Sequence, residues 1–199
     1  QLPFEQDGYM PTPERREGRH RQNPEAFPFG DWYPGDNVNV AVGQGEVLAT
    51  PLQLANAYTV FANAGSRWAP NIVERIVDHA GGAVLNFGPR QAREVEIDPA
   101  FRNRVLRGLV GVVADEEGTA YWAFNSEATD GTYFPHDQYP LAGKTGTAEV
   151  RGRADTSLFA AFGPVQEPTY VMVAVLEEAG FGSSVAAPLV ARVMTRIFE

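Results

Sequence analysis

The closing third of the chain carries the pattern that most restricts its fold. Strand-like runs occur at residues 144–150, 156–163 and 169–177, and the short turn-rich stretches between them are typical of antiparallel neighbours. The segment that follows places apolar side chains at helical spacing, at Ala186, Leu189, Val190, Val193, Met194 and Ile197. We expect an antiparallel sheet with this final helix packed on it, capped at its start by Ser183 or Ser184.

A helix is also predicted over residues 49–65, where the start and stop signals are complete. Thr50 is a natural N-cap, Pro51 suits the first helical position, and Gln53 completes a capping box. Gly65 supplies the expected C-terminal stop.

Between these regions the sequence predicts a small hairpin and another helix. The runs at 71–78 and 82–87 flank Gly81 and Gly82, which is typical of two strands joined by a tight turn. Asp98 and Pro99 then open a helix that we expect to extend to about Val113.

Residues 1–40 show no sustained hydrophobic period and are rich in proline, arginine and acidic residues. We therefore expect a loop-rich initial segment of the same domain, whose main part is residues 41–199. The basic stretch at 15–21 is interpreted as a solvated loop balanced by nearby glutamates, in preference to a patch for anionic surfaces.

Composition removes several classes of function. The net charge of −9 argues against nucleic acid as a partner. The absence of cysteine excludes disulfides, thiol catalysis and thiolate metal sites. The longest apolar run, residues 170–176, is far shorter than the roughly 20 residues that a bilayer requires. Because the chain starts with neither a methionine nor a signal peptide, an internal cut is expected there.

The stretch "LAGKTGTAEV" occupies residues 141–150, and its Gly143-Lys144-Thr145 matches the last three residues of a phosphate-binding loop. Such a loop requires a glycine five residues before Gly143, and Gln138 stands there instead. Pro140 also removes one backbone N–H donor from any phosphate cradle. The nucleotide-binding interpretation is therefore rejected.

The same stretch resembles the K-T-G motif of class B penicillin-binding proteins. The chain also contains "EEGTA" at 116–120 and "GQGEVLATPLQLANAYTVFANAG" at 43–65, in the order seen in that family. The closing strands and helix are similar to its last strands and C-terminal helix. The resemblance covers about residues 35–199, and "DWYPGD" at 31–36 resembles the elongation type, penicillin-binding protein 2.

The resemblance implies an α/β (α+β) fold, with an antiparallel sheet flanked by helices as in serine β-lactamases. It also implies a D,D-transpeptidase that cross-links peptidoglycan stem peptides and reacts with β-lactams. Lys144 would lie beside the nucleophile, while Thr145 and Thr147 would bind the substrate carboxylate. Gly146 would let the substrate approach, and the Thr147 N–H would contribute to the oxyanion hole. Strand alternation places Lys144 and Gly146 on one face and Thr145 and Thr147 on the other. The family nevertheless uses both the lysine and the second threonine in the cleft, a combination that an edge strand permits.

The other two motifs of such enzymes, S-x-x-K and S-x-N, are missing. Lys144 is the sole lysine and Leu141 stands three residues before it; no serine is followed two positions later by asparagine. We therefore expect the C-terminal part of a divided domain, inactive alone, whose N-terminal part supplies the serine.

The resemblance further implies a location on the extracytoplasmic (periplasmic) face of the bacterial membrane, through an anchor outside this chain. The implied partners are the D-Ala-D-Ala stem peptide, β-lactams and a membrane glycosyltransferase of the shape, elongation, division and sporulation family. No cofactor and no metal are expected. The alternatives are a β-lactamase or D,D-carboxypeptidase of the same fold, and a non-catalytic β-lactam-sensing or interaction domain.

Two further groups of residues, the histidines and the acidic clusters, have ordinary interpretations. His20, His79 and His136 are best interpreted as loop histidines, because nothing places them near a nucleophilic serine. The acidic pairs at 115–117 and 177–178 are interpreted as solvated side chains rather than glycosidase carboxylates.

Overall fold

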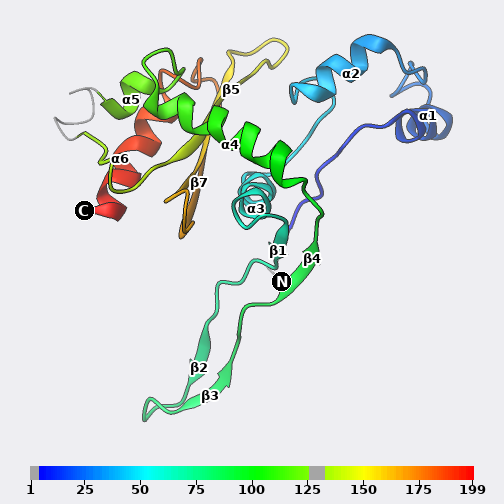
Figure 1. The fold of residues 1–199 in the computed structure, drawn as a ribbon. Helices are drawn as coiled ribbons and strands as arrows, with labels where there is room; N and C mark the ends of the chain where they lie inside the picture. Colours follow the sequence, from blue (N-terminus) through cyan, green and yellow to red (C-terminus); the bar gives the residue numbers. More distant parts are fainter. Residues whose placement is uncertain (1–4, 126–132) are drawn as a thin grey trace. The chain divides into compact units, whose positions relative to one another are not determined.

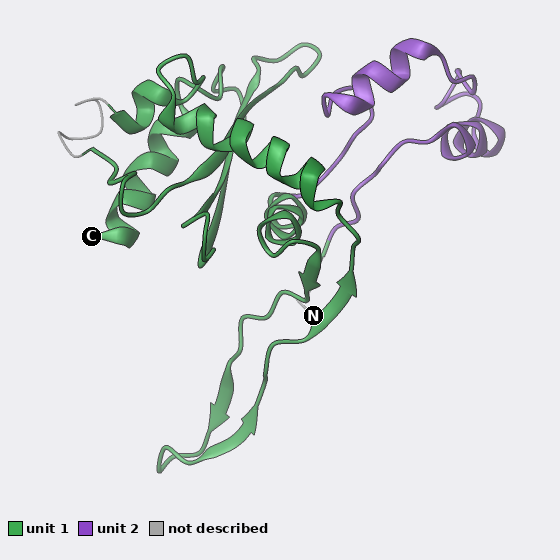
Figure 2. Cartoon of the chain, in the orientation of Figure 1, with its two compact units in different colours: residues 1–5, 51–199 green, residues 6–50 purple. Residues whose placement is uncertain are grey.

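The computed structural model describes residues 5–125 and 133–199. The chain divides into two compact units, one built on residues 51–199 and the other on residues 6–50 (Figure 2). The sheet and the helices predicted from the sequence lie in the first of these units.

Strands β5 (Ala142–Ala148), β6 (Thr156–Gly163) and β7 (Tyr170–Leu176) form an antiparallel sheet in the order β5-β6-β7 (Figure 1). The predicted meander is confirmed, although β5 starts and ends two residues before the predicted run at 144–150. Its register with β6 is continuous. Since β6 is central, β5 is an edge strand of this sheet within the described part of the chain.

Helix α6 (Ala186–Phe198) packs on one face of the sheet. Phe159 and Ala161 of β6 and Ala174 of β7 share a core with its buried side chains. Side chains alternate along a strand, so Phe162 belongs to the opposite face, where it forms a second core. The predicted packing of the final helix on the sheet is confirmed.

Helices α3 (Pro51–Ala62) and α4 (Pro99–Ala114) contribute to that second core, around Phe162. The ring of Phe61 meets the ring of Phe162 edge-on, with the centroids 6.4 Å apart. Arg102 of α4 donates its Nε and Nη2 protons to the Phe61 and Ala62 carbonyl oxygens at 2.9 and 3.0 Å. This guanidinium satisfies the last carbonyls of α3 and joins the two helices.

Both helices begin at the prolines that the sequence indicated. The Asp98 carboxylate accepts the backbone N–H groups of Ala100 and Phe101 at 2.7 and 3.0 Å, which is an N-cap. Helix α3 ends shortly before Gly65, whose φ of +122° is a conformation that favours glycine.

The predicted cap of α6 is wrong. Neither Ser183 nor Ser184 caps the helix; the hydroxyl of Ser157, in β6, accepts the Ala186 N–H at 3.1 Å. Ser157, which is distant in the sequence, therefore supplies the cap that the local spacing assigned to Ser183 or Ser184.

The apolar stripe predicted for α6 is partly wrong as well. Its buried residues are Ala186, Ala187, Val190, Ala191, Met194 and Thr195. Val193 and Ile197 are instead 37% and 41% exposed. Half of the buried residues of α6 are alanines, which allow the helix to approach the sheet closely. A pattern of large apolar side chains does not indicate them.

The predicted hairpin is present as strands β2 (Arg75–Val77) and β3 (Ala83–Asn86), with Gly81 at a φ of +84° in the turn. It continues into a second antiparallel pair, β1 (Ser66–Trp68) with β4 (Gln91–Glu94), which the sequence did not indicate (Figure 1).

The unit of residues 6–50 contains two helices, α1 (Pro13–Gln22) and α2 (Pro34–Ala41), where the sequence analysis expected loops. Thr12 caps α1 by accepting the Arg15 N–H at 3.2 Å. Neither helix buries a residue, so a hydrophobic period could not have revealed them. The cap-then-proline signal at Thr12 and Pro13 could have revealed the first.

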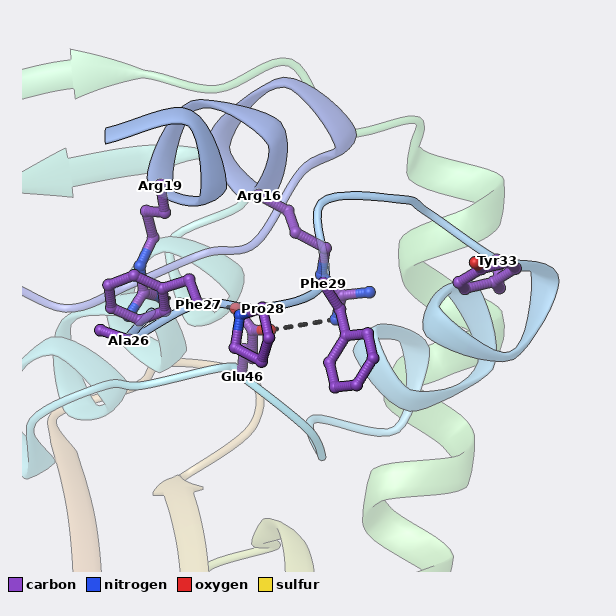
Figure 3. Close-up of a pocket in the computed structure, with 8 residues that line it drawn as sticks. All are labelled: Arg16, Arg19, Ala26, Phe27, Pro28, Phe29, Tyr33 and Glu46. Atoms are coloured by element: carbon purple, nitrogen blue, oxygen red, sulfur yellow. Dashed lines mark hydrogen bonds and ion pairs between the residues drawn. The ribbon is translucent and has the colours of Figure 1, made fainter. Parts of the chain in front are cut away.

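Arg16 and Arg19 organise this unit around Glu46. Arg16 bonds Asp36 at 2.7 Å and Glu46 at 3.0 Å, and the Arg19 guanidinium lies 3.8 Å from the centroid of the Phe27 ring. The side chains of Arg16, Arg19, Phe27 and Glu46 border a cavity of about 350 Å³ (Figure 3). Its ionic groups pair with each other, which makes it a structural feature of the unit rather than the candidate site.

Candidate active site

The residues Lys144 to Thr147 lie in the middle of the edge strand β5. In the register, Thr145 lies opposite Phe159 of the α6 face, and Lys144 lies opposite Ala160. The predicted alternation is therefore present, with Lys144 and Thr145 on opposite faces of a strand whose outer side carries no further strand among the described residues.

Lys144 borders an open cavity of about 550 Å³ between β5 and the end of α4. Its ammonium group is exposed and donates to the Thr145 carbonyl oxygen at 2.9 Å. The other lining residues are Gly108, Gly111, Val112, Asp115, Glu116, Glu117, Gly118 and Thr119. Lys144 thus presents a positive charge to a concave surface, as a binding or catalytic lysine must.

Thr145 reaches the same surface from the other face of the strand. Its hydroxyl lies 2.9 Å from the hydroxyl of Thr119, in the turn after α4. Because Thr119 lines the cavity that Lys144 borders, the edge position brings Lys144 and Thr145 to one site despite their alternation.

Thr147 and Gly146 are held by the loop before α6. The Gly182 N–H donates to the Thr147 hydroxyl at 3.3 Å. A Cβ built on Gly182 would lie 2.3 Å from the Gly146 carbonyl oxygen, and one on Gly146 would lie 3.2 Å from the Leu158 Cβ. Close backbone packing within this domain therefore already requires small residues here.

The turn beside Lys144 is acidic. Asp115, Glu116 and Glu117 are exposed and line the cavity with the single ammonium group of Lys144. These carboxylates are exposed, as the solvated interpretation predicts, and they adjoin the K-T-G segment, which the sequence did not indicate.

Among the described residues, no serine side chain lines the cavity that Lys144 borders. Ser157 is fully buried, and its hydroxyl donates to the Phe181 carbonyl oxygen at 3.0 Å while it accepts the Ala186 N–H. Its role is therefore structural. Ser126 lies outside the described residues.

The histidines form no catalytic arrangement with a serine in the described part of the chain. His20 bonds the Phe27 carbonyl oxygen through Nδ1 at 2.7 Å. His136 packs against the rings of Phe124 and Phe134, at centroid distances of 6.0 and 5.1 Å. Burial there lowers the pKa of His136, against a smaller opposing effect of the Asp137 carboxylate.

Across residues 5–125 and 133–199, no group of three or more histidine, aspartate or glutamate side chains is arranged to hold a metal ion. In the same ranges no helix has the length and apolar character to cross a bilayer.

Thr119 is the site residue that sequence reasoning missed. The stretch "EEGTA" contributed to the family resemblance, but no chemical role was assigned to its threonine. Nothing in the local sequence indicates that residue 119 meets residue 145, because the two elements are adjacent only after folding.

The comparisons with known proteins cover nearly the whole chain. Residues 1–195 match the penicillin-binding protein transpeptidase domain. The chain is 32% identical to the peptidoglycan D,D-transpeptidase MrdA of Haemophilus influenzae, over 93% of the chain and 28% of that protein. It is 28% identical to MrdA of Escherichia coli, over 92% of the chain and 28% of that protein. The chain thus spans less than a third of the length of these curated relatives.

Solved structures give the same result for the fold. Penicillin-binding protein 2 of Pseudomonas aeruginosa, in complex with the compound WCK 5153, superposes with a TM-score of 0.74 at 34% identity. The match covers all of this chain and 38% of that one. An imipenem acyl-enzyme of penicillin-binding protein A from Mycobacterium tuberculosis has a TM-score of 0.65 at 22% identity, over 81% of this chain and 33% of that one, which supports the fold alone.

Proposed function

Because the chain belongs to the family of penicillin-binding protein transpeptidase domains, we propose that it is part of a peptidoglycan D,D-transpeptidase of the penicillin-binding protein 2 type. A serine hydroxyl attacks the carbonyl carbon of the penultimate D-alanine, and the terminal D-alanine leaves with the proton on its amine. The amine of a second stem peptide then displaces the serine oxygen. The serine comes from a segment outside this sequence, which contains no S-x-x-K.

Lys144 provides the positive charge of this site. An exposed ammonium group at the edge of a concave surface can hydrogen-bond groups near the serine and favour the negative charge that develops during acylation. The acidic turn opposite makes Lys144 the local positive group among the cavity-lining residues.

The threonines of β5 bind and polarise the donor peptide. The Thr145 and Thr147 hydroxyls accommodate its terminal carboxylate, and the Thr147 N–H donates to the oxyanion. In an antiparallel ladder each residue directs its N–H and C=O to the same side, so Thr147 shares its side with the Thr145 carbonyl that Lys144 reaches. Gly146 keeps the backbone accessible between them.

The observation that carries this proposal is the convergence of Lys144 and Thr145 on one cavity at a sheet edge. Lys144 lines the cavity directly, and Thr145 bonds the cavity residue Thr119. An extended peptide can align along such an edge by backbone hydrogen bonds. The 550 Å³ of space is within the ordinary range for a small-ligand site.

The location and partners of the complete protein follow from the same proposal. It acts on the extracytoplasmic side of the membrane, on stem peptides ending in D-Ala-D-Ala, and works with a membrane glycosyltransferase of the shape, elongation, division and sporulation family. A penicillin-binding protein 2 from Helicobacter pylori has been solved in complex with MreC.

Fluorescent-penicillin labelling tests the proposal. The complete protein, and this chain by itself, are incubated with the probe and separated on a denaturing gel, and intact mass locates the acyl group. We expect label on the polypeptide that carries the S-x-x-K serine and none on this chain alone.

Three results would contradict it. Label on this chain alone would mean that it contains its own nucleophile. No label on a folded complete protein would favour the non-catalytic alternative. Release of the label within seconds, by water, would instead favour the β-lactamase alternative.

A further inference from the structure

The hydroxyl of Thr119, outside β5, hydrogen-bonds the hydroxyl of the proposed substrate-binding residue Thr145. The two oxygens, on Thr119 and Thr145, are 2.9 Å apart, and either could be the donor in the absence of substrate. The residues are 26 positions apart in the sequence. This contact therefore joins the turn after α4 to the K-T-G strand.

The turn that presents Thr119 has little freedom to move. The Gly118 N–H donates to the Asp115 carbonyl oxygen at 2.7 Å, and the Ala120 N–H donates to the Val112 carbonyl oxygen at 3.0 Å. A Cβ on Gly118 would lie only 2.2 Å from the Gly111 carbonyl oxygen, so the backbone at 118 is packed directly on the end of α4.

The residue that follows Thr119 is fixed as well. Ala120 is 1% exposed and belongs to the core that contains Val113 and Phe124. It leads directly into helix α5 (Tyr121–Asn125), whose Asn125 donates to the Val113 carbonyl oxygen at 2.9 Å. Thr119 is therefore an exposed hydroxyl held between two closely packed residues, which is how a positioning group must be built.

Counting protons gives the direction of the hydrogen bond when substrate is bound. A carboxylate has only acceptor atoms, and a threonine hydroxyl has a single proton. If Thr145 donates its proton to the carboxylate, it cannot also donate to Thr119. Thr119 must then be the donor, and its bond orients the Thr145 oxygen while leaving the Thr145 proton for the ligand.

We propose that Thr119 is a positioning residue that donates to Thr145 and so directs the Thr145 proton at the carboxylate of the donor peptide or β-lactam. The proposal rests on the proposed function, because it requires Thr145 to bind that carboxylate. In this chain Thr119 donates to Thr145, and Thr145 donates to the carboxylate. Successive hydrogen bonds of this kind strengthen one another, and Thr119 needs no contact with the substrate.

The test is a double-mutant cycle in the complete protein. The variants are Thr119→Val, Thr119→Ser, Thr145→Val and the Thr119→Val/Thr145→Val pair. Thr119→Ala serves as a second hydroxyl-free variant, in case valine disturbs the turn. The readout is the second-order rate constant of acylation by fluorescent penicillin. Its dependence on probe concentration separates the affinity for the probe from the rate of the chemical step. Thr169→Val is the matched control, since its hydroxyl bonds the Gly163 carbonyl oxygen away from this cavity.

We expect Thr119→Val to lower the second-order rate constant about three- to tenfold, the usual range for one neutral hydrogen bond. The loss should appear as weaker probe binding, and Thr119→Ser should restore it. In the Thr145→Val background, removing the Thr119 hydroxyl should change the rate less than about 1.5-fold. Thr169→Val should label as the unmodified protein does.

The inference is overturned if the two hydroxyl-free variants label at the normal rate, or if their loss persists unchanged in the Thr145→Val background. The second result would mean that Thr119 only stabilises the turn. A complete protein that is never acylated overturns the proposed function, and the inference with it, whereas normal labelling of Thr119→Val overturns the inference alone.

Discussion

The hydroxyl of Ser157, fully buried in β6, accepts the backbone N–H of Ala186, the first residue of α6, at 3.1 Å. It also donates to the Phe181 carbonyl oxygen at 3.0 Å. We expect Ser157→Ala to lower the free energy of unfolding by about 1–3 kcal/mol, because the buried Ala186 N–H and the Phe181 carbonyl oxygen both lose their partner. Chemical denaturation of this chain measures the change.

Ser184→Ala is the matched control for that substitution. Ser184 is exposed and does not cap α6, so its loss should change the free energy of unfolding by less than about 0.5 kcal/mol. Equal effects of the two substitutions would restore the local cap that the sequence predicted.

Gly182 supports β5 through close backbone packing, with its Cβ position 2.3 and 2.4 Å from the carbonyl oxygens of Gly146 and Leu158. We expect Gly182→Ala to destabilise the fold by about 1–3 kcal/mol and to slow acylation of the complete protein, because the strand that holds Thr147 must shift. Gly88→Ala, where a Cβ meets nothing within 4 Å, should do neither. Normal labelling of Gly182→Ala would show that the loop does not position the strand.

Substitution of Lys144 should lower the acylation rate and leave the free energy of unfolding nearly unchanged. Replacing it by methionine keeps the length of the side chain and removes the charge. We expect acylation of the complete protein to fall about 10²–10³-fold, as for the loss of other electrostatic groups at active sites. The free energy of unfolding should change by less than about 0.5 kcal/mol, since Lys144 is exposed. Arg151→Met, in the turn after β5, is the control, and labelling of Lys144→Met at the control rate would remove Lys144 from the mechanism.

His136 should make stability depend on pH. Burial lowers its pKa below the ordinary value of 6.5, so the unfolded chain binds a proton at a higher pH than the folded chain does. The contribution of this group is therefore complete above pH 6.5 and is lost as the pH falls below that value toward the folded pKa. We expect His136→Gln to flatten the decline in unfolding free energy as the pH falls below about 6.5. An unaltered slope in His136→Gln would contradict the assignment.

Arg16 should hold the unit of residues 6–50 together. Its side chain is 16% exposed and bonds Asp36 and Glu46, whereas Arg21 pairs with Glu17 at 72% exposure. We expect Arg16→Met to speed amide hydrogen exchange in this unit at least about fivefold, equivalent to about 1 kcal/mol. Arg21→Met should have almost no effect, and similar exchange in the two variants would contradict the distinction.

Local signals were sufficient for most of the elements in residues 51–199. Thr50-Pro51 and Asp98-Pro99 marked helix starts correctly because a cap and a proline act on adjacent backbone groups. The meander was predictable for a similar reason, since short turns leave antiparallel pairing as the accessible arrangement. Helix α1 was missed because its polar surface carries no hydrophobic period.

The candidate site likewise has features that the local sequence indicates and features that it does not. The motif at 144–147 was recognisable from consecutive residues, and it indicated the family. The partner of Thr145, the acidic turn beside Lys144 and the contact of Gly182 with Gly146 were not readable, because each joins segments that are far apart in the sequence.

What the sequence determined by itself was therefore most of the elements in residues 51–199, the order of the β5-β6-β7 strands and the K-T-G motif that led to the family. Tertiary structure alone decided which hydroxyl caps α6 and which hydroxyl meets Thr145. The physical reason is that propensity, capping and turn formation depend on neighbours along the chain, whereas Ser157 and Thr119 acquire their partners only when the sheet and its helices have packed.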